Sequence, residues 1–154
     1  MRNLIVIAAC FAALSCSSSG RTTGADAEGT GINRAALMIV QLEPPRSMTR
    51  AGEEIEVRYG VRATNNTAEE ITLRRLLLAP GGTGGPYVVQ RQQYFFQHRI
   101  PAHSVHEFEF WAKANTTGSP QSIDARAPVT IRATAHFETA AGPFRKTITQ
   151  HVNQ

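Results

Sequence analysis

The chain of 154 residues is expected to fold as an all-β domain, a seven-stranded antiparallel β-sandwich. Two observations predict this class. Apolar and polar residues alternate with a period of two along several short segments, which is typical of strands that have one face on a core and one in water. Turn-forming residues separate these segments, and no segment has a convincing helical period. Short strands separated by turns favour two sheets packed face to face.

The first two strands are expected at residues 36–42 and 54–63. The first ends at Pro44 and Pro45, and a short helix capped at Asn33 is its alternative. In the second, EIEVRYGVRA, apolar residues alternate with charged residues and Gly60, and the strand ends in the turn sequence TNNT. It is the clearest half-buried strand in the chain.

The third strand is expected at residues 70–78, where the alternation changes phase at Arg74 and Arg75. Either a β-bulge or burial of both faces at the end of the strand would explain the change. The loop PGGTGGP follows at residues 80–86. It has the glycines of a phosphate-binding loop but neither the Gly-Lys-Ser/Thr ending nor a following helix, so a phosphate site is not expected there.

One strand is expected at residues 87–98 and the next at 106–113, with a turn at 100–104 between them. A helix competes for the second segment, because Ser104 and Glu107 fit a capping box. The sequence FEFW favours the strand through its alternation and its β-propensity. A polar loop is expected at 115–127, and the last strands at 129–138 and 144–152.

Several of these segments resemble Ig-like and fibronectin-type-III-like modules of bacterial envelope proteins. The resemblance lies in LEPP at 42–45, AGEEIEV at 51–57, the strand end at 61–66 and IPAHS at 100–104. It implies an Ig-like sandwich and no activity. The Cys…Trp…Cys core of antibody domains is absent.

The N-terminus has the order of a secretory signal: Arg2, an uncharged apolar run at residues 4–14, then small residues. The run is too short for a transmembrane helix. Residues 13–16, ALSC, resemble the lipobox of bacterial lipoproteins. The resemblance implies cleavage after residue 15 and acylation of Cys16 as the first mature residue. An ordinary signal peptide and a secreted domain are the alternative.

Cys10 is a second possible lipidation site, because IAAC at residues 7–10 also fits the pattern. Cleavage there would leave an apolar run of only six residues, so Cys16 is preferred. No cysteine follows Cys16, so the folded part has no disulfide and no thiol nucleophile. We therefore expect a signal peptide at 1–15, an acylated cysteine and flexible tether at 16–33, and a β-sandwich domain at 34–154.

The mature chain would be slightly basic. The full chain has 16 Lys and Arg against 12 Asp and Glu, and only Arg2 leaves with the signal. Such an excess does not indicate a nucleic-acid partner. Ser17 after the cysteine resembles lipoproteins sent to the outer membrane. We expect an outer-membrane lipoprotein facing the periplasm, with the cell surface or secretion as alternatives.

Catalytic motifs are missing from the sequence. It contains no Gly-x-Ser-x-Gly, His-Glu-x-x-His or Ser-x-x-Lys pattern, so we expect no enzyme and no cofactor. His98, His103 and His106 flank one expected turn and could converge on a transition metal. However, no carboxylate or thiolate lies at a matching spacing, and His106 falls on the core-facing side of its strand.

Two functions therefore remain. The first is a lipid-anchored, non-catalytic interaction module, bound to the membrane through Cys16 and to another envelope protein through strand edges or the loops at 81–86 and 115–127. The second is a carrier of a small ligand or metal that uses His98, His103 and His106.

Overall fold

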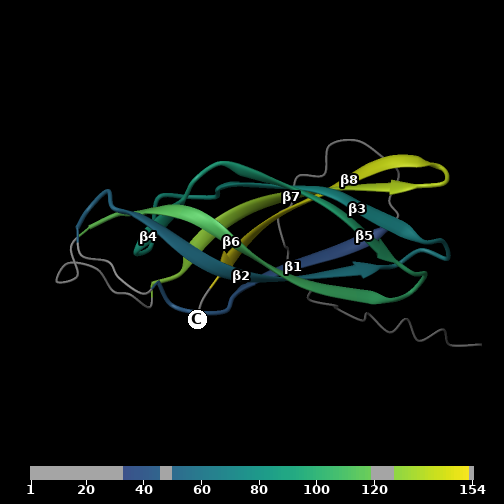
Figure 1. Cartoon of the computed structure of the whole chain (residues 1–154), viewed down its shortest axis with the longest axis horizontal. Helices are drawn as coiled ribbons and strands as arrows, with labels where there is room; N and C mark the ends of the chain where they lie inside the picture. The colour runs from purple at the N-terminus through teal and green to yellow at the C-terminus, as the bar shows by residue number, and fades with distance from the viewer. Residues whose placement is uncertain (1–32, 46–49, 119–126, 153–154) are drawn as a thin grey trace, which may run out of the picture.

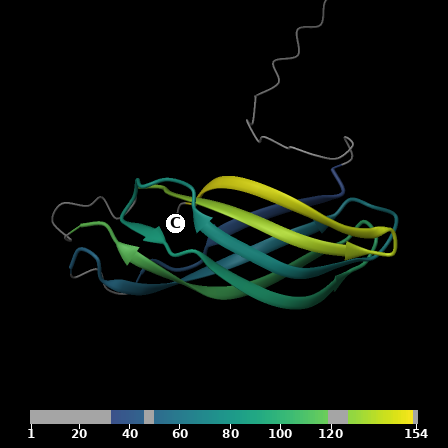
Figure 2. The same ribbon diagram turned by 90° about the horizontal axis from the view of Figure 1, so that it is seen from above.

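The computed structural model describes residues 33–45, 50–118 and 127–152, which form two antiparallel sheets packed face to face (Figures 1 and 2). No helix occurs in these ranges, and so none that is long and apolar enough to cross a membrane. The predicted signal peptide, both cysteines and most of the predicted tether lie outside the described residues. The all-β sandwich prediction is confirmed.

The described residues form eight strands. Sheet A has the strand order β1-β2-β6-β4, and sheet B has the order β5-β3-β7-β8. The strands are β1 (Ala35–Gln41), β2 (Glu54–Asn65), β3 (Ile71–Pro80), β4 (Tyr87–Val89), β5 (Gln92–Ile100), β6 (Val105–Thr116), β7 (Val129–Thr139) and β8 (Gly142–Val152).

The predicted count of seven strands is wrong, because the single strand expected at residues 87–98 is two strands. β4 pairs with β6 in sheet A, and β5 pairs with β3 in sheet B. The chain crosses between the sheets at Gln90 and Arg91. The inward-facing positions change from odd (Tyr87) to even (Tyr94) across this crossing. The residues between them are polar and show no alternation of apolar and polar side chains, so the sequence pattern does not reveal where one strand ends and the next begins.

The other open alternatives are resolved in favour of strands. Residues 36–41 lie in β1 and residues 106–113 in β6, so neither proposed helix forms. The phase change in β3 is a bulge: its register with both β5 and β7 shifts between Leu73 and Arg75. Residues 115 and 116, expected in a loop, still belong to β6.

One hydrophobic core lies between the sheets, and a pair of tyrosines is its main polar feature. Tyr59 and Tyr87 are 0% and 1% exposed, and their hydroxyl oxygens are 2.9 Å apart. The Tyr87 hydroxyl donates to Gln41 Oε1 at 2.6 Å, so the Tyr59 hydroxyl donates to that of Tyr87. Burial raises the pKa of Tyr87 to about 12.

Asn65 joins two turns at one end of the sandwich. Its buried Nδ2 lies within 3.0 Å of the carbonyl oxygens of Glu69, Ile100 and Pro101. Its Oδ1 accepts hydrogen bonds from the backbone N–H and the hydroxyl of Thr67. The side chain therefore holds the β2–β3 turn against the β5–β6 turn and satisfies backbone groups that no strand pairs.

Glutamine side chains connect the two sheets along both sides of the sandwich. On one side, Gln150 of β8 donates to the Ile39 carbonyl of β1 (2.8 Å) and accepts from the Ile39 N–H (3.2 Å). On the other side, Gln92 of β5 forms the same pair of bonds with Lys113 of β6 (2.7 and 3.0 Å). An amide side chain offers the donor and acceptor of a peptide group, so each glutamine substitutes for one residue of a neighbouring strand.

Candidate functional site

Among the described residues, one edge of β6 lacks a partner strand over most of its length. β6 pairs with β2 on one side, but β4 covers its other side only at residues 114–116. β4 ends there because the chain crosses to sheet B. Within the described part of the chain, no strand pairs with this second edge over residues 105–112. Unpaired edges of this kind can accept an added strand.

The direction of the backbone groups shows which residues offer them. The amide and carbonyl of Thr116 bond to the segment before β2, whereas the Lys113 carbonyl accepts from Gln90 N–H on the β4 side at 2.9 Å. Because these directions alternate along an antiparallel strand, the odd-numbered residues from Val105 to Trp111 direct their N–H and C=O groups to the open edge.

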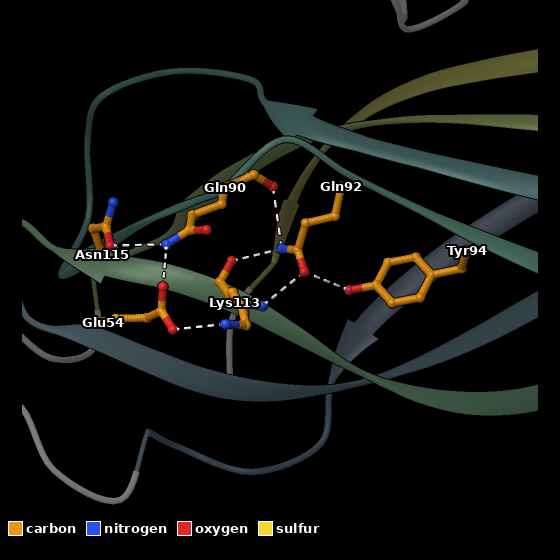
Figure 3. A network of polar contacts seen from close by, with 6 residues as sticks. All are labelled: Glu54, Gln90, Gln92, Tyr94, Lys113 and Asn115. Atoms are coloured by element: carbon orange, nitrogen blue, oxygen red, sulfur yellow. Dashed lines mark hydrogen bonds and ion pairs between the residues drawn. The ribbon is translucent and has the colours of Figure 1, made fainter.

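Side chains close the first part of this edge, next to β4 (Figure 3). Beyond the Gln92 pair with Lys113, Gln90 Nε2 donates to Glu54 Oε2 and Asn115 Oδ1, both at 3.0 Å. The Tyr94 hydroxyl lies 2.9 Å from Gln92 Oε1 and 2.7 Å from the Trp111 carbonyl oxygen, to one of which it donates. The open length of the edge therefore begins after Trp111 and continues to Val105.

Two large apolar side chains mark the two ends of the open length. Val105 is 52% exposed and Trp111 is 46% exposed. The guanidinium of Arg58 lies 6.0 Å from the Trp111 ring and pairs with both Glu109 and Glu43. Beside Trp111, the outer face of sheet A has a hollow of about 430 Å³, lined by Glu43, Pro44, Glu54, Ile55, Glu56, Arg58 and Trp111.

An aromatic row fills the space between β5 and β6, behind the open edge. Tyr94 contacts Phe110, Phe96 contacts Phe108 and His98 contacts His106, with ring centroids 4.7, 4.8 and 4.5 Å apart. Tyr94, Phe96 and Phe108 are only partly buried and pack on the core. The apolar surface of the core therefore comes close to the open edge, where an added strand could cover it.

The three predicted histidines are only partly brought together. His98 and His106 belong to the aromatic row, and burial, followed by the nearby His106, lowers the pKa of His98. His106 Nε2 is buried and has no hydrogen-bond partner within the described part of the chain. His103 is exposed in the β5–β6 turn with a φ of 53°. Among the described residues, no group of three His, Cys, Asp or Glu is placed to hold a metal ion.

The glycine-rich loop at residues 81–86 has a packing role. Gly85 has a φ of +94°, and a Cβ there would lie 2.9 Å from the Pro128 carbonyl oxygen. Gly81 donates to the Thr130 carbonyl at 2.9 Å, and its Cβ would lie 2.7 Å from the Thr130 side chain. The loop therefore needs these glycines for close approach to β7. The second predicted contact loop lies largely outside the described residues.

The residues that sequence reasoning missed are the glutamines. Gln90, Gln92 and Gln150 appeared only as polar residues within or next to strands. Their partners on other strands are 21 to 111 residues away. The one available signal was the cluster of three glutamines around the crossing from β4 to β5, at residues 90, 92 and 93.

Comparisons with known proteins support the fold only. No family model matches the chain, and no curated protein matches it. The structural-genomics target SoR45 is 13% identical and aligns with a TM-score of 0.50, covering 79% of this chain and 86% of that one. Two further structures align less closely. The putative ApaA protein of Bordetella pertussis is 16% identical, with coverage of 78% of this chain and 91% of that one and a TM-score of 0.47. The GAE domain of yeast GGA1 is 15% identical, with coverage of 79% and 94% and a TM-score of 0.45. The similarity to SoR45 supports the β-sandwich.

Proposed function

We propose that this chain is a lipid-anchored envelope protein whose domain acts as a non-catalytic interaction module, binding an extended segment of another envelope protein along the open edge of β6. The observation that carries the proposal is the unpaired backbone between Val105 and Trp111, with an exposed aromatic side chain at one end. Main-chain hydrogen bonds would give affinity, and side chains at alternate positions would give specificity.

The anchor is part of the same proposal. Cys16 is the acylated residue, after cleavage at residue 15, and the protein belongs to the outer membrane on its periplasmic side. The flexible tether at 16–33 would let the sandwich reach on the order of 20 Å from the lipid. The sandwich itself is proposed to be Ig-like. Its strand order, β1-β2-β6-β4 over β5-β3-β7-β8, supports this because it corresponds to the constant-type order ABED over CFG with β5 added beside β3.

A proline substitution tests the edge directly. Glu109 directs its N–H to the open edge, so Glu109→Pro removes one donor there while leaving the bonds between β6 and β2 intact. Glu109→Ala is the matched control, because it removes the carboxylate and keeps the N–H. A photo-crosslinking residue at Val105 captures the partner in intact cells, and one at Thr149 of β8 reports non-specific capture.

We expect a discrete envelope protein to be captured from position 105 and not from 149, in the wild type and in Glu109→Ala. We expect Glu109→Pro and Cys16→Ala to lose this product while retaining the thermal midpoint of a folded domain. Equal capture from both positions, or undiminished capture in Glu109→Pro, would refute the edge as the binding site.

A carrier function is the second candidate, and one observation favours it. The unpaired, buried Nε2 of His106 lies beside His98, which leaves one imidazole nitrogen free for a ligand. Titration with Zn(II) or Cu(II) tests this function. Stoichiometric binding that is lost in His98→Phe and in His106→Phe would support a carrier, whereas weak binding unaffected by either change would exclude it.

A further inference from the structure

The two outer faces of the sandwich carry different charges. On sheet B, the outward-facing positions hold five arginines and one glutamate: Arg74, Arg75, Arg99, Arg132, Arg145 and Glu138. On sheet A, the strands hold three cationic and four acidic residues on the outward face: Arg58, Arg62, Lys113, Glu54, Glu56, Glu107 and Glu109. The excess positive charge of the domain is therefore concentrated on sheet B.

Much of the charge on sheet B is not neutralised. Arg74 pairs with Glu138 at 2.6 Å, and Arg99 lies 4.0 Å from Glu70. Within the described residues, Arg75, Arg132 and Arg145 have no carboxylate partner. On sheet A, by contrast, all three cations pair with glutamates.

Two of the unpaired arginines form a row with a histidine. His136 of β7 is the register partner of Arg75 on β3 and of Arg145 on β8. Burial, followed by these two arginines, lowers the pKa of His136. Phe95 continues the row on β5 as the register partner of Arg75, and it is 71% exposed.

The shape of this face indicates the kind of partner. The three arginines without a carboxylate partner come from three different strands: Arg75 of β3 and Arg145 of β8 flank His136, and Arg132 lies four residues before His136 on β7. One hollow on this face is lined by other residues: Glu69, Glu70, Thr72, Arg74, Glu138, Thr139 and Ala140. A surface with many phosphate groups can contact all three arginines at once, although they belong to different strands.

The N-terminal segment enters the sandwich at the β8 edge of sheet B. The Arg34 guanidinium lies 5.7 Å from the centroid of the Phe144 ring on β8, and Lys146 Nζ donates to Asn33 Oδ1 at 3.1 Å. The 32 residues that precede the described part therefore join it beside the strand that carries Arg145. A lipid attached to those residues would bring this side of the domain towards the membrane.

We propose that the outer face of sheet B binds the surface of an anionic phospholipid membrane, with Arg75, Arg132 and Arg145 against lipid phosphates and Phe95 among the headgroups. The orientation that this gives to the anchored protein rests on the proposed lipidation, but the binding itself does not. Electrostatic contact of this kind supplements a lipid chain as a second membrane signal. It would leave sheet A, with the open edge of β6, available to a protein partner.

Vesicle sedimentation tests the proposal without the lipid anchor. All eight strands and the whole core lie within residues 35–152, so residues 17–154 contain the folded domain without either cysteine. Vesicles of phosphatidylcholine, with and without roughly 30 mol% phosphatidylglycerol, are compared at low and high salt. The test variant is Arg75→Gln/Arg132→Gln/Arg145→Gln. The control is Arg58→Gln/Arg62→Gln/Lys113→Gln, which changes net charge equally on the opposite face.

We expect binding only to the anionic vesicles, weakened by salt. Each arginine near the surface contributes roughly fivefold, so the sheet B variant should bind roughly a hundredfold more weakly while the sheet A variant stays within about twofold of the wild type. Circular dichroism confirms that both variants are folded. Phe95→Ser gives a smaller loss that depends little on salt.

Three results would overturn the proposal: no preference for anionic vesicles, equal losses in the two triple variants, or binding to soluble polyphosphate that is as tight as binding to vesicles. The last result would reassign the face to a soluble polyanion. None of these results bears on capture at the β6 edge, so failure of this proposal is distinguishable from failure of the proposed function.

Discussion

Gln150 is expected to hold the edge of β1 as a substitute for a neighbouring strand, and its replacement by glutamate tests this. The amide donates to the Ile39 carbonyl and accepts from the Ile39 N–H. A carboxylate has the same shape and can still accept the N–H. It cannot donate, and it directs a negative charge at the carbonyl oxygen.

The magnitude follows from these two contacts. Loss of one hydrogen bond and repulsion of a partly buried carbonyl together cost about 2 kcal/mol, which for a domain of this size lowers the thermal midpoint by about 8 °C at pH 7. A protonated carboxyl both donates and accepts, so the variant should regain most of this stability at low pH. The same cost of about 2 kcal/mol would raise the folded-state pKa of the carboxyl introduced by Gln150→Glu by about 1.5 units, from about 4.3 to roughly 5.8.

Folding raises the pKa of this carboxyl group. The stability that its protonated form contributes is therefore fully present below the pKa of the unfolded state and is lost as the pH rises through the pKa of the folded state. Denaturant unfolding at several pH values between about 4 and 7 measures it, as a difference between Gln150→Glu and the wild type. Gln97→Glu is the control, because Gln97 is exposed on the outer face of β5. A Gln150→Glu variant that equals the wild type at pH 7, or that shows no more pH dependence than Gln97→Glu, would show that Gln150 does not hold the edge.

Three further predictions concern buried polar groups. Tyr87→Phe should destabilise the domain by about 2–3 kcal/mol, because it leaves the Tyr59 hydroxyl buried without an acceptor. Tyr59→Phe should cost only about 1 kcal/mol. Denaturant unfolding that shows a larger loss of stability for Tyr59→Phe than for Tyr87→Phe would contradict the assigned donor direction. Asn65→Ala should cost about 3 kcal/mol, because several buried backbone groups lose their partner, and a thermal midpoint within about 2 °C of the wild type would refute this clamp. Folding lowers the pKa of His98, so as the pH falls the unfolded state takes up a proton before the folded state does, and the free energy of unfolding should decrease below about pH 6.5. His98→Phe should remove the part of this pH dependence that the residue contributes. An unchanged pH dependence, measured by denaturant titration, would contradict the burial of a neutral imidazole beside His106.

The all-β class and most strand positions could be predicted from local patterns. The segment 54–63 alternates because successive side chains of a strand point to opposite faces, and β2 buries the apolar set as expected. The phase change at Arg74 and Arg75 indicated an irregularity for the same reason, and of its two explanations the structure shows the bulge. These features depend on residues that are close together in the chain, so they can be predicted from the sequence.

The candidate site was much less predictable. The open edge of β6 exists because β4 stops after three residues and the chain continues in the other sheet. The residues at that crossing are polar, so their order gives no sign of which sheet each strand joins. The predicted group of three histidines separated into an interior pair and an exposed turn residue, because the strand directions at both ends of the turn decide which side chains meet.

The sequence by itself determined that the chain forms short antiparallel strands with one apolar face each, since alternation and turn chemistry act over a few residues. Only the tertiary structure decided which strands are neighbours, and with them the open edge, the glutamine contacts and the concentration of arginines on one sheet. Those features join residues far apart in the chain, such as Ile39 and Gln150, 111 residues apart. Their pairing is selected by the packing of the whole core, which no single segment specifies.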